Sequence, residues 1–148
     1  LNIISDLTTQ EKEILSNFKY RKNKAVIHSD ESSMPKNKKA WCSWNSSLNP
    51  KNNQQSSVTY WLNQLQNLKI DKNIFLTINP FFNINPDLIY NTIDFTHPYY
   101  DQKALENQSK LRSIQNINNT LYAGSYFGYG FHEDGIKSSI EMLKTLND

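Results

Sequence analysis

All four glycines of this 148-residue chain lie between positions 124 and 135. Glycine adopts positive φ angles without steric cost and lets the backbone approach another group closely. A chain that avoids glycine elsewhere and collects it in one stretch concentrates its unusual backbone there. The four are Gly124, Gly128, Gly130 and Gly135. This stretch is the first candidate for a binding site.

The same distribution excludes two kinds of site. The G-x-G-x-x-G turn binds the pyrophosphate of a dinucleotide at the first strand–helix junction. No such turn can exist before Gly124, so the ADP half of a dinucleotide has no visible site. Ser125 directly follows Gly124, so the G-x-S-x-G turn of serine hydrolases is absent as well.

The composition narrows the class of protein. Hydrophobic residues make up 37% of the chain and aromatic residues 12%, which can support a core. A net charge of +2, with lysines scattered between Asn and Ser, argues against nucleic acid as a partner. No apolar run approaches the roughly 20 residues of a transmembrane segment. Cys42 is the single cysteine, which predicts no disulfide, a reducing compartment and a cytoplasmic location.

Metal-site patterns are missing from the sequence. The three histidines, His28, His97 and His132, are far apart, and none belongs to an H-E-x-x-H helix. With one cysteine, a multi-cysteine site is also excluded. We therefore predict no metal site.

The order of the apolar patterns, strands first and then helix, strand, loop and helix, predicts an α+β fold. A capping box at Thr8 and Glu11 predicts a helix to about Phe18, and Asp101 is expected to cap a second helix. A third is expected from Gly135 to Leu146, and a helical turn after Trp61. The polar segment 46–57 reads as a mobile loop. Strands are expected at 24–28, 40–45, 58–61, 74–78, 89–95 and 120–123.

The order strand, glycine loop and helix start near the C-terminal end favours a ligand site. A helix N-terminus presents free N–H groups and a positive dipole end to an electron-rich group. Glu133 and Asp134 at that end would repel a phosphate, whereas a carbonyl that gains charge only during reaction suits it. The alternative is an irregular surface loop in which both acids are ordinary helix caps.

The segment Tyr122–Ile136, which reads Y-A-G-S-Y-F-G-Y-G-F-H-E-D-G-I, resembles the C-terminal motif of bacterial NAD/FAD-binding proteins of the flavin-containing amine oxidase superfamily. Five shorter segments resemble other parts of that family in the same order, so the resemblance covers nearly the whole chain from Thr8 onward. They are H-S-D at 28–30, M-P at 34–35, W-C-S-W-N at 41–45, L-T-I-N-P at 76–80 and H-P at 97–98.

This resemblance implies the C-terminal portion of an FAD-dependent oxidoreductase that transfers a hydride from substrate to flavin. Residues 1–96 would belong to the mixed sheet of the substrate-covering domain, and residues 97–148 would complete the FAD-binding domain with a strand and a helix. Members of the family carry G-x-G-x-x-G near their N-terminus, so the implied partner is a missing N-terminal dinucleotide-binding portion. The substrate would be a small molecule or a lipid-like chain.

The resemblance also implies roles for particular residues. His132 stands where amine oxidases place an aromatic side chain facing the flavin, and it would add proton transfer. A hydrogen-bonded structural histidine is the alternative. Trp44, Tyr60 and Tyr129 are the substrate-binding candidates, although such aromatic residues also fill sheet cores. The residues expected near the flavin are Gly124, Ser125, Glu133, Asp134, Gly135 and Ile136.

A second class of function stays open. A non-catalytic binding or interaction module could retain the fold without the cofactor. As a separate prediction, the chain alone is expected to expose a large apolar surface where the missing domain docks.

Overall fold

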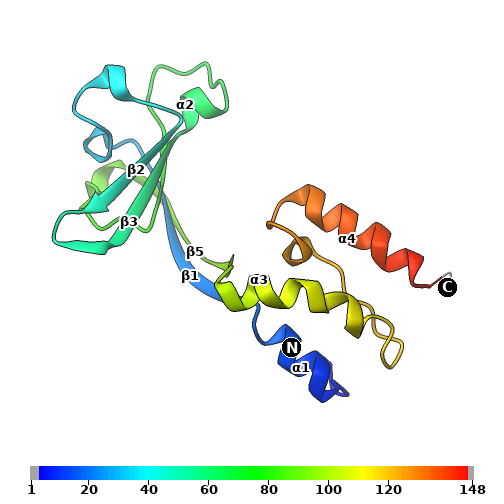
Figure 1. Cartoon of the computed structure of the whole chain (residues 1–148). Coiled ribbons are helices and arrows are strands. Elements are labelled where there is room, and N and C mark those ends of the chain that lie inside the picture. Colours follow the sequence, from blue (N-terminus) through cyan, green and yellow to red (C-terminus); the bar gives the residue numbers. More distant parts are fainter. Residues whose placement is uncertain (1–3, 147–148) are drawn as a thin grey trace. The chain divides into compact units, whose positions relative to one another are not determined.

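The computed structural model describes residues 4–146 and shows an α+β fold (Figure 1). A five-stranded antiparallel sheet has the strand order β2-β3-β4-β1-β5. The described strands are β1 (Lys19–His28), β2 (Trp44–Asn49), β3 (Asn52–Trp61), β4 (Phe75–Ile78) and β5 (Ile89–Tyr99). The described α-helices are α1 (Thr9–Leu15), α2 (Leu62–Leu65), α3 (Gln102–Gln108) and α4 (His132–Lys144).

The predicted α+β class is confirmed, but the sheet is antiparallel rather than mixed. Neighbouring strands β2 and β3 are joined by a tight turn, and no helix crosses between parallel strands. Within residues 4–146, no helix has the length and apolar character needed to cross a membrane.

The chain divides into two compact units. The sheet unit is Lys22–Thr96, and the helical unit combines Leu1–Arg21 with His97–Asp148. Strands β1 and β5 both run across the division between the units. The first 21 residues group with the C-terminal residues because α1 packs against the segment that follows α3. This grouping differs from the expected division into 1–96 and 97–148, in which these residues belong with the sheet. That these units are domains of a flavoenzyme stays a prediction.

The segment expected to be a mobile loop, 46–57, is instead a β-hairpin. Trp44 pairs with Tyr60 and Leu48 with Ser56, and Asn49 Oδ1 accepts a hydrogen bond of 2.9 Å from Lys51 N at the turn. The ladder consists of backbone hydrogen bonds, which polar side chains do not prevent. Composition alone was therefore misleading here.

One face of the sheet is covered and carries buried polar side chains. His28 Nδ1 accepts from Asp30 N at 3.1 Å, and His28 Nε2 lies 2.7 Å from Thr77 Oγ1. Thr77 Oγ1 is in turn 2.9 Å from Thr59 Oγ1. These contacts connect β1, β4 and β3. In the same unit, the rings of Phe75 and Trp41 are in contact, with centroids 5.7 Å apart. The strand expected at 40–45 begins only at Trp44.

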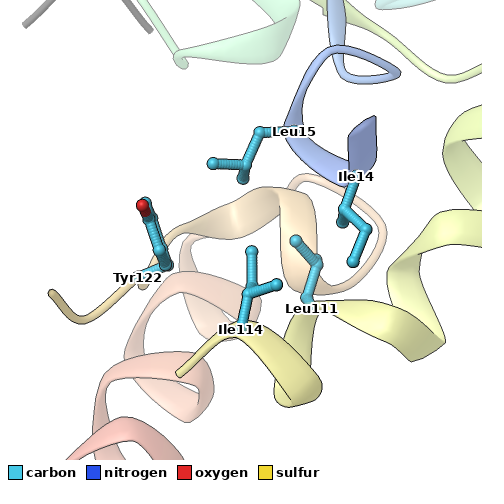
Figure 2. Close-up of a cluster of buried hydrophobic side chains, with 5 residues drawn as sticks. All are labelled: Ile14, Leu15, Leu111, Ile114 and Tyr122. Atoms are coloured by element: carbon cyan, nitrogen blue, oxygen red, sulfur yellow. The ribbon is translucent and has the colours of Figure 1, made fainter. Parts of the chain in front are cut away.

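The helical unit has an apolar core between α1 and the segment that follows α3. Figure 2 shows this cluster, which contains Ile14, Leu15, Leu111, Ile114 and Tyr122. Beside it lies the fully buried carboxylate of Glu11. Its Oε1 accepts from Tyr122 Oη at 2.8 Å, and its Oε2 accepts from Thr8 N at 2.7 Å. The predicted capping box is confirmed.

Three expected element boundaries in the last third are wrong. No strand forms at 120–123, because the Gln115 side chain satisfies both backbone groups of Tyr122, with distances of 2.9 Å to its N and O. Strand β5 continues through Pro98 to Tyr99. Helix α4 begins at His132 instead of Gly135. The cap at Asp101 is confirmed, since Asp101 Oδ1 accepts from Ala104 N at 2.9 Å.

Candidate functional site

The glycine segment, residues 124–135, folds into a compact turn against the start of α4. Ser125–Phe127 forms a 3-10 turn, and the carbonyl of Ser125 accepts from Gly128 N and Gly130 N, each at 3.1 Å. Gly130 has φ +94°, a conformation that residues with a Cβ rarely adopt. A Cβ on Gly128 would lie 2.4 Å from Asp134 Oδ1. The clustering of glycine is explained by backbone geometry at these positions.

Gly135 differs from the other three glycines. It lies inside the first turn of α4, and a Cβ there would be 3.7 Å from Ser125 N, an ordinary contact distance. The fold of the chain itself therefore does not need glycine at this position.

The two acids at the helix start have different environments. The Asp134 carboxylate is turned into the loop, where Oδ2 accepts from Tyr129 N and Phe131 N, each at 3.0 Å. Glu133 is exposed and lies 3.8 Å from Lys137 Nζ. Among residues 4–146, the N–H groups of His132 and Glu133 have no acceptor. The start of α4 thus keeps two free donors although a carboxylate is nearby.

Two polar side chains that sequence analysis did not identify hold the glycine segment. Gln108 Nε2 donates to the carbonyls of Tyr126 and Gly128, at 3.1 and 2.6 Å. Ser138 Oγ accepts from Gly124 N at 2.8 Å and donates to Gly135 O at 2.7 Å. Only the spacing of Ser138 three residues after Gly135 could have suggested its role; nothing in the sequence points to Gln108.

The side chains predicted to act at this site are mostly exposed. His132 occupies the first position of α4, and its imidazole has no hydrogen-bond partner among the described residues. That geometry does not match a hydrogen-bonded structural histidine. Tyr129 is 82% exposed and Ile136 57% exposed. Ser125 is half-buried.

A cavity of about 470 Å³ borders the glycine segment inside the helical unit. Gly128 and Asp134 lie at its edge, Phe127 and Met142 supply apolar surface, and Arg112 supplies a positive charge. Its volume is within the range of small-molecule sites.

Helix α4 leaves its apolar stripe uncovered. Ile136, Ile140 and Leu143 are 57%, 52% and 52% exposed, whereas Ser138 on another side of the helix is buried. A surface helix ordinarily buries its apolar stripe against the core. This exposed stripe matches the apolar surface expected for a docking partner.

The sheet unit contains a second candidate surface, which we call the open face. Side chains alternate between the two faces of a strand, so the registers place a set of half-buried or exposed apolar residues opposite the covered polar face. Its members are Ile27, Trp44, Leu48, Val58, Tyr60, Leu76 and Ile78.

The substrate-binding candidates Trp44 and Tyr60 are brought together on this open face. They are direct cross-strand partners, and their ring centroids are 5.2 Å apart at an interplanar angle of 69°. Trp44 is 64% exposed and Tyr60 is half-buried, so this ring pair does not lie in a core. Tyr129 belongs to the helical unit.

Among the described residues, no group of His, Cys, Asp and Glu is arranged to hold a metal ion. No protein-family model matches the chain, and no curated protein matches it.

Proposed function

We propose that the chain is the C-terminal portion of an FAD-dependent oxidoreductase of the amine oxidase type, which transfers a hydride from substrate to flavin. The observation that supports this most is the start of α4, where His132 and Glu133 keep free N–H groups beside a compact glycine turn. Tyr122–Ile136 resembles the family's flavin-facing motif, and this resemblance implies that the two N–H groups bind a flavin.

The residues present fit the pyrimidine edge of a flavin. That edge carries carbonyl and nitrogen acceptors that become more negative on reduction, and a helix N-terminus stabilises such charge. The charge of Asp134 is already compensated by two N–H groups, and Glu133 lies near Lys137. The resemblance implies that the backbone at Gly135 approaches the flavin closely. Bound FAD would supply the hydride acceptor.

Different residues of the chain would then bind the flavin, transfer a proton and contact the substrate. The N–H groups of His132 and Glu133 would bind and orient the flavin edge. The His132 imidazole, exposed at the first position of α4, would hold or release a proton. Trp44 and Tyr60 on the open face would contact the substrate. The exposed stripe of α4 would be covered by an N-terminal dinucleotide-binding portion.

Expression of the complete gene product that contains this chain tests the proposal. The purified protein should be yellow, with flavin absorbance that is released by denaturation and identified as FAD. His132→Phe tests the proton role separately, since unchanged turnover over the whole pH range would remove it. A colourless protein that folds cooperatively contradicts the proposal.

One observation favours the second candidate, a binding module without cofactor. The glycine segment is already held by Gln108, Ser138 and Asp134 from within the chain. It therefore needs no ligand to fold. A colourless, cooperatively folding product in the experiment above would select this candidate.

A further inference from the structure

We propose that the exposed stripe of α4 binds a second copy of this chain, with the two α4 helices side by side and antiparallel. The stripe consists of Ile136, Ile140 and Leu143, each more than half exposed. This inference goes beyond the proposed function, in which an N-terminal portion covers the same stripe. It concerns the chain when no such portion is bound, so the two partners are alternatives at one surface.

The stripe faces away from the buried side of α4. Successive residues of an α-helix are about 100° apart, so Ile136, Ile140 and Leu143 lie within about 60° of one another. Ser138, which is 5% exposed, lies on the opposite side of the helix. A helix of a second copy can therefore lie along the stripe without disturbing the buried side.

Four charged side chains of alternating sign border one side of the stripe. Lys137 Nζ lies 3.8 Å from Glu133 Oε1, and each of these side chains is about two-thirds exposed. Lys144 Nζ donates to Glu141 Oε1, and these side chains are also more than half exposed. Exposed pairs of this kind stabilise a helix only slightly, and their charges stay accessible to a further partner.

The order of these charges fits an antiparallel second copy. In an antiparallel pair the same border of both helices comes together, and the charge order of one copy is read in reverse by the other. Glu133 of each copy then meets Lys144 of the other, and Lys137 meets Glu141, so two-fold symmetry forms each contact twice. Charges beside an apolar seam determine partner and orientation in this way.

A parallel pair lacks these contacts. Its symmetry would turn the charged border of each copy toward the opposite border of the other helix. That opposite border contains Gly135, Ser139 and Met142, which carry no charge. The charge pattern therefore selects the antiparallel arrangement.

The apolar residues fit the same register. The register that brings Glu133 to Lys144 is centred near Ser139. It places Ile140 beside Ile140 of the second copy, and Ile136 beside Leu143 of the second copy. One arrangement therefore covers the stripe and pairs the charges at the same time.

The charges of α4 disfavour a membrane surface as the occupant. Helices that lie on anionic membranes are rich in Lys and Arg on their polar face. Helix α4 contains three acids, Glu133, Asp134 and Glu141, and two lysines, Lys137 and Lys144. An anionic lipid surface would repel the acids, whereas a second copy matches both signs.

Sedimentation equilibrium of the 148-residue chain tests this inference. Cys42 is exposed, so the measurement needs reducing conditions to prevent a disulfide-linked dimer. The apparent mass should rise from monomer toward dimer over about a hundredfold range of concentration. One 13-residue helix from each copy gives a contact only about 20 Å long, so the dimer should be weak and exchange rapidly. A chain that stays monomeric throughout overturns the inference.

Charge variants test the pairing without removing apolar surface. Glu133→Lys and Lys144→Glu each place like charges opposite one another twice, and should weaken self-association at least about fivefold. An equal mixture of the two variants should associate as strongly as the unchanged chain, because each contact between the different copies then joins opposite charges. Circular dichroism before mixing shows whether α4 has kept its helix. Failure of helical variants to associate on mixing overturns the antiparallel register.

Apolar variants provide the matched comparison. Ile140→Lys changes a side chain that is 52% exposed, so the chain should fold and remain monomeric. Leu65→Lys, at a position 43% exposed on α2, should dimerise like the unchanged chain. Equal loss of the dimer in both variants overturns the inference.

Engineered cysteines test the register directly. In a Cys42→Ser background, Ile140→Cys should form a disulfide-linked dimer on mild oxidation, since position 140 lies beside itself across the symmetry axis. Ile136→Cys should cross-link only when it is mixed with Leu143→Cys. Cross-linking of Ile136→Cys alone as fast as Ile140→Cys would overturn the antiparallel arrangement.

The complete protein separates this inference from the proposed function. A monomeric chain whose complete protein is yellow overturns the inference alone. A dimeric chain with these properties whose complete protein is colourless overturns the proposed function alone. In a yellow complete protein, Ile140→Cys should not cross-link, because the N-terminal portion then covers the stripe.

Discussion

The glycines of the glycine segment differ in whether the fold of the chain requires a glycine at that position. Gly130 is needed for its φ of +94°, and Gly128 for its contact with Asp134. Gly135 has neither reason, because a Cβ there would make an ordinary contact. The sequence showed where the glycines cluster. It could not show which of them the chain itself requires, because that depends on the neighbours of each Cβ position.

Alanine at position 130 and alanine at position 135 should therefore change the free energy of unfolding differently. Gly130→Ala should lower the free energy of unfolding by about 1–2 kcal/mol, because a Cβ is strained at this φ. Gly135→Ala should leave it unchanged or raise it by up to about 1 kcal/mol, since alanine favours helix. Urea unfolding measures both. In the complete protein, Gly135→Ala should lose flavin, and Ser139→Ala should retain it; full flavin retention by Gly135→Ala would refute close approach at this position.

Glu11 gives the helical unit a specific dependence on pH. Hydrogen bonds from Thr8 hold the pKa of the buried carboxyl below its ordinary value of 4.5. Since the folded state favours the carboxylate, this stability is fully present above pH 4.5 and is lost as pH falls below it. Glu11→Gln should flatten the acid limb of a stability–pH curve. The exposed Glu13→Gln should leave that limb unchanged.

At the level of elements, signals that act within a few residues predicted two helix caps correctly, although the start of α4 was predicted three residues too late. The capping box at Thr8 and the cap at Asp101 act within four residues, so the sequence contains all of their partners. The hairpin at 44–61 depends on backbone pairing, and the missing strand at 120–123 depends on Gln115. The open face could not be predicted either, because it follows from the registers of four strands.

The cap at Asp101 should be measurable on its own. Asp101→Ala removes the acceptor for Ala104 N and also the contact with Lys19 Nζ at 3.4 Å. We expect a loss of stability that comes nearly all from the cap, because the ion pair is exposed. Thermal unfolding checks this, with Lys19→Ala to measure the ion pair alone. A larger loss for Lys19→Ala would contradict the assignment.

At the scale of the whole molecule, the two units contain different buried titratable groups. Burial lowers the pKa of His28 in the sheet unit below its ordinary value of 6.5. The neutral imidazole accepts from Asp30 N, so protonation would remove that hydrogen bond. The stability that depends on neutral His28 is present above pH 6.5 and is lost as pH falls below it.

The sheet unit should therefore weaken at a higher pH than the helical unit. Amide exchange measured from pH 7 to pH 4 should show β1, β3 and β4 opening first, and α1 only below pH 4.5, where the stability that depends on Glu11 begins to be lost. Thr77→Val should destabilise the sheet unit by about 1–3 kcal/mol, since it leaves the His28 Nε2–H group without an acceptor. Opening of both units at the same pH would contradict this expected order.

The grouping of the first 21 residues with the last third has a consequence for the order of synthesis. Glu11 and Tyr122 are separated by 111 positions, and the whole sheet unit lies between them. At about 5–20 residues per second, roughly 5 to 20 s pass before the ribosome delivers Tyr122. The sheet unit can complete its ladders during that interval. Ile14 and Leu15 of α1 therefore stay uncovered until Leu111, Ile114 and Tyr122 have been synthesised.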